Sequence, residues 1–262
     1  MSKVVLAHGR DPEEVVFKAL DELGISPRGE RIVIKPNLII NRPPPVTTPA
    51  DAVEAIIKYF AQVSKEIIIA EGSGWGETSD AFRDLGYEEV ARRYGVQLVD
   101  LNQDRYEIRR SKQTMVLNEI EFPLTLIDCY LVSAASLKTH SSTKITLSLK
   151  NMLGATIGER VAAGKKRRFH RLGLDESIVD LALYKKPNLA IIDGREACLG
   201  GELSGVAKRF DLMIFSEDPV AADAVGAKIL GYDPTSIPHL KLAQERGLGM
   251  AELSEIEVKE LR

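Results

Sequence analysis

Short apolar segments rich in β-branched residues alternate with segments of helical periodicity along almost the whole chain. The strand-like segments, each bounded by turn residues, are KVVLAH, RIVIKPN, EIIIAEGSG, VQLVDLN, LIDCYLVSA, NLAIIDG and DLMIFSEDP. The helical segments, several of which open with Asp, Ser, Thr or Pro, are residues 11–23, 49–62, 78–94, 175–183, 219–230 and 236–246. This alternation predicts an α/β fold in which helices cover both faces of a largely parallel sheet.

One segment departs from the alternation. Residues 105–123, RYEIRRSKQTMVLNEIEFP, alternate polar and apolar side chains and contain no crossover helix. This pattern predicts a β-hairpin or meander outside the parallel order, forming a cap or a small lobe. We expect one α/β domain over residues 1–262, because no low-complexity linker or internal repeat divides the chain.

The composition is that of a soluble globular protein. The 262 residues are 28% charged and 44% hydrophobic, with a net charge of −3, which does not favour a nucleic-acid partner. We expect a cytoplasmic protein without a membrane contact, since the chain lacks a targeting segment and an apolar run of about 20 residues. Many charged residues with few Cys and Gln are typical of heat-adapted proteins. The sequence does not indicate an oligomeric state.

The number of cysteines limits which cofactors the chain could bind. The chain has two, Cys129 and Cys198, too few for a disulfide framework or a four-cysteine iron–sulfur site. We therefore expect buried thiols and no intrinsic iron–sulfur cluster.

Polar residues stand where several predicted strands end. The groups concerned are Lys35-Pro36-Asn37, Glu71-Gly72-Ser73-Gly74, Lys138-Thr139-His140, Asp193-Gly194 and Glu217-Asp218. Ligands of open parallel sheets bind beyond the carboxyl ends of the strands, where helix N-termini also lie. Each group alone also suits an ordinary turn. Together they predict one cleft at this edge of the sheet.

The stretch from Leu131 to Arg160 carries the densest set of candidate groups, namely Lys138, His140, Lys150, Asn151 and Arg160. Within it, the pattern of residues 143–152 suits either a strand or a helix. We favour a helix that is capped by Ser141 or Ser142 and ends at a left-handed Gly154. Fixed cations at the start of this helix would bind a phosphate or a carboxylate.

Residues 158–173, GERVAAGKKRRFHRLG, form a strongly basic segment that includes His170. Such a cluster is often no more than a solvated surface. The alternative is a mobile lid that closes over an anionic ligand, with glycines at its hinges. A nucleic-acid site is disfavoured, because Phe169 is the one aromatic residue available for stacking.

Two aspartates are assigned to structural support. Asp218 before Pro219 is typical of a helix N-cap. Asp223 lies one turn further, in a helix made mostly of Ala, Val and Gly, and we expect it to pair with Lys138 or Lys150 and so order the site.

Other site signals are weaker. EGSGWG lacks the spacing of a P-loop or a dinucleotide-binding loop, although Trp75 within it could form the wall of a ligand site. No pair of histidines has a zinc-like spacing. A divalent metal held by Asp or Glu and bridging to phosphate stays compatible with the sequence.

Several ordered motifs resemble those of the domain-of-unknown-function 362 (DUF362) family. They are IKPNL, TTPADAVEAI, EGSG, AFRDLGY, LKTH, TLSLKNMLG, RRFHRLG, IIDG and SEDPVAADAVGAKILG, spanning about residues 30–250. The resemblance implies this fold and a site at these motifs, but no established reaction. Some members of that family carry ferredoxin-type cysteine modules, which this chain lacks, so the resemblance implies a separate redox or iron–sulfur partner if electrons are needed. The order of the motifs is also similar, more faintly, to lactate racemase-like proteins, which implies an isomerase as a further alternative.

Two functional hypotheses follow. In the first, the chain is an enzyme acting on a small anionic metabolite, in which His140, Lys138 and Lys150 are catalytic. The ligand-binding residues would be Lys35, Asn37, Glu71, Ser73, Asn151, Arg160, His170 and Asp193. In the second, it is a carrier or accessory protein for an anionic cofactor, a metal or an iron–sulfur partner, and it needs neutralising charge but no titratable group.

Overall fold

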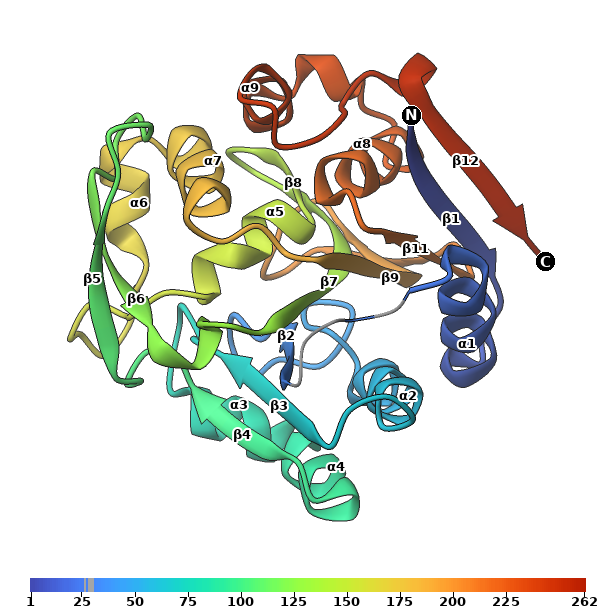
Figure 1. The fold of residues 1–262 in the computed structure, drawn as a ribbon, viewed down its shortest axis with the longest axis horizontal. Coiled ribbons are helices and arrows are strands. Elements are labelled where there is room, and N and C mark those ends of the chain that lie inside the picture. The colour runs from blue at the N-terminus through green and yellow to red at the C-terminus, as the bar shows by residue number, and fades with distance from the viewer. Residues whose placement is uncertain (26, 28–30) are drawn as a thin grey trace.

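The computed structural model describes residues 1–25, 27 and 31–262 and has the predicted α/β architecture (Figure 1). Its strands are β1 Ser2–His8, β2 Arg31–Pro36, β3 Glu66–Glu71, β4 Gln97–Asp100, β5 Tyr106–Arg110, β6 Glu119–Pro123, β7 Tyr130–His140, β8 Lys144–Thr146, β9 Leu189–Leu199, β10 Val206–Arg209, β11 Leu212–Ser216 and β12 Ile256–Leu261. Its α-helices are α1 Pro12–Leu23, α2 Ala50–Phe60, α3 Thr78–Asp84, α4 Tyr87–Tyr94, α5 Ser148–Asn151, α6 Arg167–Leu172, α7 Leu174–Tyr184, α8 Pro219–Ile229 and α9 Pro238–Glu245. Short 3-10 turns are η1 Leu124–Leu126, η2 Met152–Gly154, η3 Pro234–Ser236 and η4 Leu253–Glu255.

The main sheet has the order β12-β1-β11-β9-β7-β2-β3-β4, with β10 added to β9 and β8 added to β7. Strands β4, β3, β2, β7 and β9 are mutually parallel, whereas β11 runs antiparallel to both of its neighbours. The carboxyl end of β11 therefore lies at the opposite edge from those of β2, β3, β7 and β9. For this reason Asp218, which follows β11, is separated from the other predicted strand-end groups.

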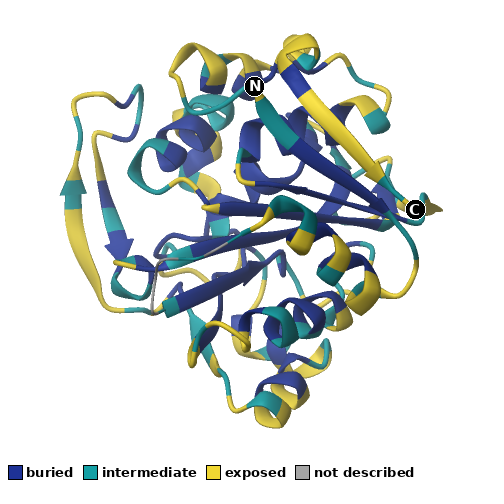
Figure 2. Cartoon of the chain, turned by 45° about the vertical axis from the view of Figure 1, so that its right-hand side comes forward, coloured by how far each residue is buried: buried dark blue, intermediate teal, exposed yellow. Residues whose placement is uncertain are grey.

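Helices cover both faces of the sheet, as predicted. Helices α1, α2, α3 and α4 pack on one face, and α5, α7, α8 and α9 pack on the other, each side with its own apolar core. The central strands are buried and the edge strand β12 is largely exposed (Figure 2). Within the described residues, no helix is long and apolar enough to cross a membrane.

The predicted hairpin over residues 105–123 is confirmed. Strands β5 and β6 pair antiparallel and form a two-stranded sheet apart from the main one. The buried carboxyl group of Asp180 on α7 anchors the loop between them by accepting hydrogen bonds from the backbone N–H groups of Met115, Val116 and Leu117.

The structure corrects several predicted boundaries. Strands β7 and β9 continue to His140 and Leu199, so that Lys138 and Asp193 lie within strands. The predicted helix 78–94 is two helices, because Gly86 adopts a left-handed φ of 83° between them. Strands β10 and β12 and helix α6 were not predicted.

The helix favoured for residues 143–152 is wrong in its first half. Lys144 to Thr146 form β8, which pairs with the end of β7, and helical structure begins only at Ser148. Neither Ser141 nor Ser142 caps it. Gly154 is part of η2 and does not have the left-handed conformation that we expected.

Candidate anion-binding cavity

A cavity of about 150 Å³ lies beyond the carboxyl ends of β2, β3 and β7, and we call it the Lys150 cavity. The residues predicted from the sequence that line it are Lys35, Asn37, Glu71, Trp75, His140, Lys150, Asn151 and His170. They come from β2, β3, β7, α5 and α6 and from the turns after β2 and β3. The topology thus brings together groups that are up to 135 positions apart in the chain.

A buried ion pair forms one wall of the cavity. Lys35 Nζ lies 2.8 Å from Glu71 Oε1 and donates further hydrogen bonds to the carbonyl of Pro36 and to Asn151 Oδ1. The three N–H groups of this ammonium are therefore all used within the protein. Burial lowers the pKa of Lys35, and the nearby Glu71 carboxylate opposes that effect. Lys35 therefore orders the site and has no N–H left for a ligand.

Glycine allows the backbone to approach this pair. A Cβ atom on Gly154 would lie 2.2 Å from Glu71 Oε1 and 2.8 Å from Lys35 Nζ. The carboxylate of Glu71 also accepts backbone hydrogen bonds from Leu38 and Gly72 and is held firmly in place. No larger residue fits at position 154 without moving the ion pair.

Lys138 lies behind the cavity wall rather than in it. It is 1% exposed, and its ammonium donates to Asn37 Oδ1 and to the carbonyl of Val46, 2.7 Å away. Asn37 in turn donates to Asn151 Oδ1. Burial, and then the neighbouring charge of Lys150, lower the pKa of Lys138 to about 7.

Lys150 is the exception among these buried lysines. Its side chain lines the cavity, and the residue is only 6% exposed. Its ammonium forms no hydrogen bond or ion pair with any residue that the structure describes. Burial lowers the pKa of Lys150 to about 8, and the more distant carboxylates of Glu202 and Asp175 oppose this shift.

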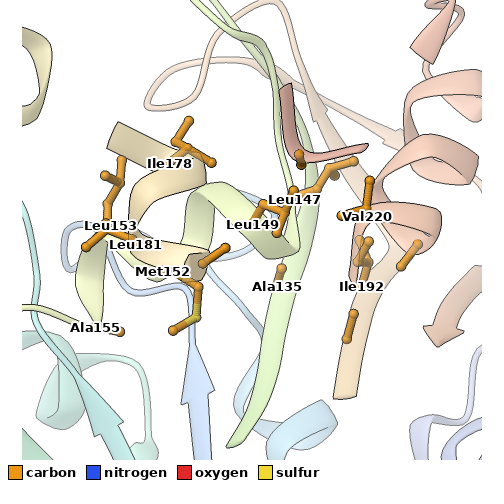
Figure 3. Close-up of a cluster of buried hydrophobic side chains, with 14 of the residues drawn as sticks. Ala135, Leu147, Leu149, Met152, Leu153, Ala155, Ile178, Leu181, Ile192 and Val220 are labelled. Carbon is orange, nitrogen blue, oxygen red and sulfur yellow. The ribbon is translucent and has the colours of Figure 1, made fainter. Parts of the chain in front are cut away.

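Helix α8 and the apolar core together position Lys150. The Asp223 carboxyl group accepts hydrogen bonds from the backbone N–H groups of Ser148 and Leu149, at 2.7 and 2.9 Å, and so caps α5 from another helix. The expected pairing of Asp223 with Lys138 or Lys150 is therefore wrong. The apolar side chains from Leu147 to Ala155 gather between α7, the sheet and α8 (Figure 3). This packing faces the polar side of α5 toward the cavity.

His140 is arranged as a hydrogen-bond donor. Its Nδ1 accepts hydrogen bonds from the backbone N–H groups of Ser142 and Thr143, which assigns the proton of the neutral ring to Nε2. Nε2 lies 3.5 Å from Glu202 Oε1. Burial, and then the charge of Lys150, lower the pKa of His140 to about 3. The ring is therefore neutral at pH 7, which favours Lys150 over His140 as the group that exchanges a proton.

The basic segment forms the mouth of the cavity. Lys166 donates to the carbonyl and hydroxyl oxygens of Thr156 and lines the cavity. The exposed guanidinium of Arg167 lies over the ring of Trp75, 5.2 Å from its centroid, and has no hydrogen-bond acceptor among the described residues. Residue 165 donates its backbone N–H to the carbonyl of Gly74, so the segment is closed over the β3 turn. Its motion as a lid stays a prediction.

Two wall residues were missed from the sequence. Thr146 is 6% exposed, and its buried hydroxyl has no hydrogen-bond partner. It is directly opposite Lys138 in the β7–β8 pair, a position that only the correct strand assignment reveals. Glu202 comes from the glycine-rich loop GREACLGGELSG after Asp193; the position of this loop in the sequence indicated a place next to the site, but Glu202 itself was not assigned to it.

Other predicted residues lie outside the cavity. Ser73 is fully buried and donates to the carbonyl of Leu38. Asp193 lines a different cavity and pairs with Arg195, whereas Arg160 lines a third, beside the β5–β6 hairpin. Asp218 caps α8 at the opposite edge of the sheet by accepting from the N–H groups of residues 220 and 221.

The predicted divalent metal, held by Asp or Glu and bridging to phosphate, stays a prediction. Within residues 1–25, 27 and 31–262, no group of three or more His, Cys, Asp or Glu side chains could hold a metal ion. The Glu71 carboxylate forms an ion pair with Lys35. The Glu202 carboxylate lies 3.5 Å from Nε2 of His140. These residues do not form a protein cage for a divalent metal.

Comparison with known proteins agrees with the motifs. The thylakoid-associated protein sll1697 of Synechocystis sp. (strain ATCC 27184 / PCC 6803 / Kazusa) is 26% identical over 230 residues, which cover 84% of this chain and 69% of that protein. No solved structure matches the chain significantly. A family model described as domain of unknown function (DUF362) matches residues 32–228, which include the strands and helices that surround the cavity. The chain therefore belongs to the DUF362 family.

Proposed function

We propose that this protein is an enzyme that acts on a small organic anion bound in the Lys150 cavity. The observation that carries the proposal is that two cations of the cavity wall lack an acceptor. The ammonium of Lys150 is almost completely buried without a partner, and the guanidinium of Arg167 is stacked on Trp75 without one. A buried cation without a partner is costly, and a bound anion would remove that cost.

The charge balance of the wall favours an anion. Glu71 is neutralised by Lys35, so that Glu202 is the remaining carboxylate among the lining residues. Lys150 and Arg167 both line this cavity. A phosphate or carboxylate would meet this excess of positive charge in a site that water screens poorly.

A titratable group near neutrality favours an enzyme over a carrier. A carrier needs only fixed charge, whereas catalysis of proton transfer needs a group whose pKa is close to the working pH. Lys150, with a pKa lowered to about 8, meets that requirement inside the cavity. We assign this activity to the cytoplasm, as the sequence predicts.

The binding part of this proposal is tested with two matched arginines. We expect Arg167→Gln to weaken binding of inorganic phosphate or of small carboxylates by roughly tenfold or more, since a hydrogen bond to a charged group contributes about 1.5–3 kcal/mol. Arg160→Gln removes the same charge from the same segment but on a different cavity, and it should leave affinity unchanged. Isothermal titration calorimetry measures both. Equal losses for the two variants would indicate nonspecific attraction and refute the site.

The catalytic part needs the natural ligand. Native mass spectrometry of the freshly purified protein should detect a co-purifying anion, which is then offered to the protein at substoichiometric concentration. Recovery of a changed compound supports the enzyme. Quantitative recovery of the unchanged compound would indicate the carrier instead.

A further inference from the structure

Lys150 also has the surroundings of a nucleophile. It is buried, whereas Arg167 is exposed at the mouth of the cavity and is free to bind the anionic group. Burial lowers the pKa of Lys150, and desolvation of this kind leaves a lysine amine unprotonated and reactive near neutral pH.

Two other residues of the cavity lining can handle the protons of such a reaction. Thr146 lines the same cavity, and its buried hydroxyl has no partner among the described residues, so that it can accept one hydrogen bond and donate another. The neutral ring of His140 directs its Nε2–H toward the Glu202 side of the same wall. Both can donate to an oxygen that becomes negatively charged.

We propose that Lys150 forms a Schiff base with the carbonyl carbon of the bound anion, so that the substrates are small carbonyl compounds bearing a carboxylate or a phosphate. This inference rests on the anion-binding function proposed above and specifies its chemistry. The unprotonated Lys150 Nζ attacks the carbonyl carbon, and the C=O electron pair moves to oxygen. A proton passes from nitrogen to that oxygen, with the Thr146 hydroxyl as the relay. The carbinolamine then loses its hydroxyl group together with the remaining N–H proton as water, leaving a C=N bond to Lys150.

The positions of the charged residues favour one orientation of a carbonyl compound that bears a carboxylate or a phosphate, with its carbonyl group toward Lys150. Its anionic end is attracted to the exposed Arg167 at the mouth, which leaves the carbonyl group to face the buried amine. Glu202 lies on the same wall and would disfavour the reversed pose by repelling the anionic end from His140.

Borohydride trapping tests the inference with two ligand pairs. The carbonyl probes are 2-oxobutyrate and dihydroxyacetone phosphate, and their matched controls are 2-hydroxybutyrate and glycerol 3-phosphate, which lack the carbonyl group. Reduction of the Schiff base gives a stable secondary amine. The protein mass should then increase by the mass of the carbonyl probe less one oxygen atom, and the control ligands should give no adduct. The pair that reacts shows whether the substrate bears a carboxylate or a phosphate.

Peptide mapping should locate the adduct on Lys150. The adduct should be lost in Lys150→Met and in Lys150→Arg, which keeps the charge but not the nucleophilic amine. It should persist in Lys112→Met, which removes a lysine from the exposed hairpin loop. The trapping rate in the parent protein should rise with pH up to about pH 8 and then level off, because burial lowers the pKa of Lys150 to about 8.

The outcomes separate this inference from the proposed function. Binding of the carbonyl probes by calorimetry without any adduct, or with an adduct on Lys166 or Lys138, refutes the Schiff base and leaves anion binding intact. Failure of all four probes and of phosphate to bind refutes both. Adduct formation that is as fast in Lys150→Met as in the parent would show nonspecific modification and overturn the inference.

Discussion

Replacing Lys150 by Met should stabilise the protein at neutral pH while removing its proposed chemistry. Each pKa unit between the folded and unfolded chain corresponds to about 1.4 kcal/mol. Lowering the pKa of Lys150 from its usual 10.5 to about 8 therefore costs the folded state about 3 kcal/mol below pH 8. Methionine has a similar length and no charge to desolvate, so we expect the free energy of unfolding to rise by about 1–3 kcal/mol at pH 7.

The stability gained by Lys150→Met should depend on pH. The folded-state pKa of Lys150 is lower than the unfolded one, so the unfolded chain binds more protons between pH 8 and 10.5. The stability of the parent protein should accordingly increase over this range, relative to a variant that does not titrate there. The advantage of Lys150→Met should thus be largest at pH 7 and should shrink toward pH 10. Urea unfolding followed by circular dichroism measures it at both pH values.

Lys35 provides the matched control, since it is an equally buried lysine whose three N–H groups all have acceptors. Lys35→Met leaves the Glu71 carboxylate buried without its cation and should destabilise the protein by about 3–5 kcal/mol. The same substitution should therefore have opposite effects at the two sites. A destabilised Lys150→Met protein, or a gain in stability that does not change with pH, would refute the argument that Lys150 is an uncompensated buried cation.

Three further substitutions test how the site is built. Gly154→Ala places a Cβ 2.2 Å from Glu71 Oε1 and should lower the free energy of unfolding by about 1–3 kcal/mol; an unchanged urea midpoint would contradict the close approach. Asp223→Ala removes the cap of α5 and should lower the free energy of unfolding by at least about 2 kcal/mol. It should also slow borohydride trapping at Lys150. A loss of stability without slower trapping would show that the cap does not position Lys150. Asp180→Ala should speed hydrogen exchange in the hairpin while leaving α5 protected, and equal exchange in parent and variant would show that this anchor is unimportant.

The sheet and the meeting of polar strand ends could be predicted because both follow from local sequence patterns. Buried parallel strands are short β-branched runs, and their carboxyl ends share one edge whatever their order in the sheet. Lys35, Glu71 and His140 could therefore be assigned to the same edge without knowing which strands are neighbours. Asp218 could not be excluded in this way, because the direction of β11 is set by its pairing with β1 and β9 rather than by its own residues.

The interior of the site was harder to predict because it depends on long-range contacts. Residues 143–152 carry a strand and a helix in succession, and each pattern is too short to separate from the other by periodicity. The helix begins at Ser148 because a carboxyl group 75 positions away caps it, and no residue near position 148 indicates that cap. Thr146 and Glu202 were missed for the same reason.

Roles among the buried lysines follow from counting acceptors rather than charges. The sequence placed Lys35, Lys138 and Lys150 in one predicted site. In the folded chain Lys35 has three acceptors, Lys138 has two and Lys150 has none among the described residues. A fully bonded ammonium is fixed and contributes geometry, whereas one without acceptors is a net cost that folding alone does not explain. The lysine with the fewest contacts is therefore the one whose presence points most directly to a ligand and to chemistry.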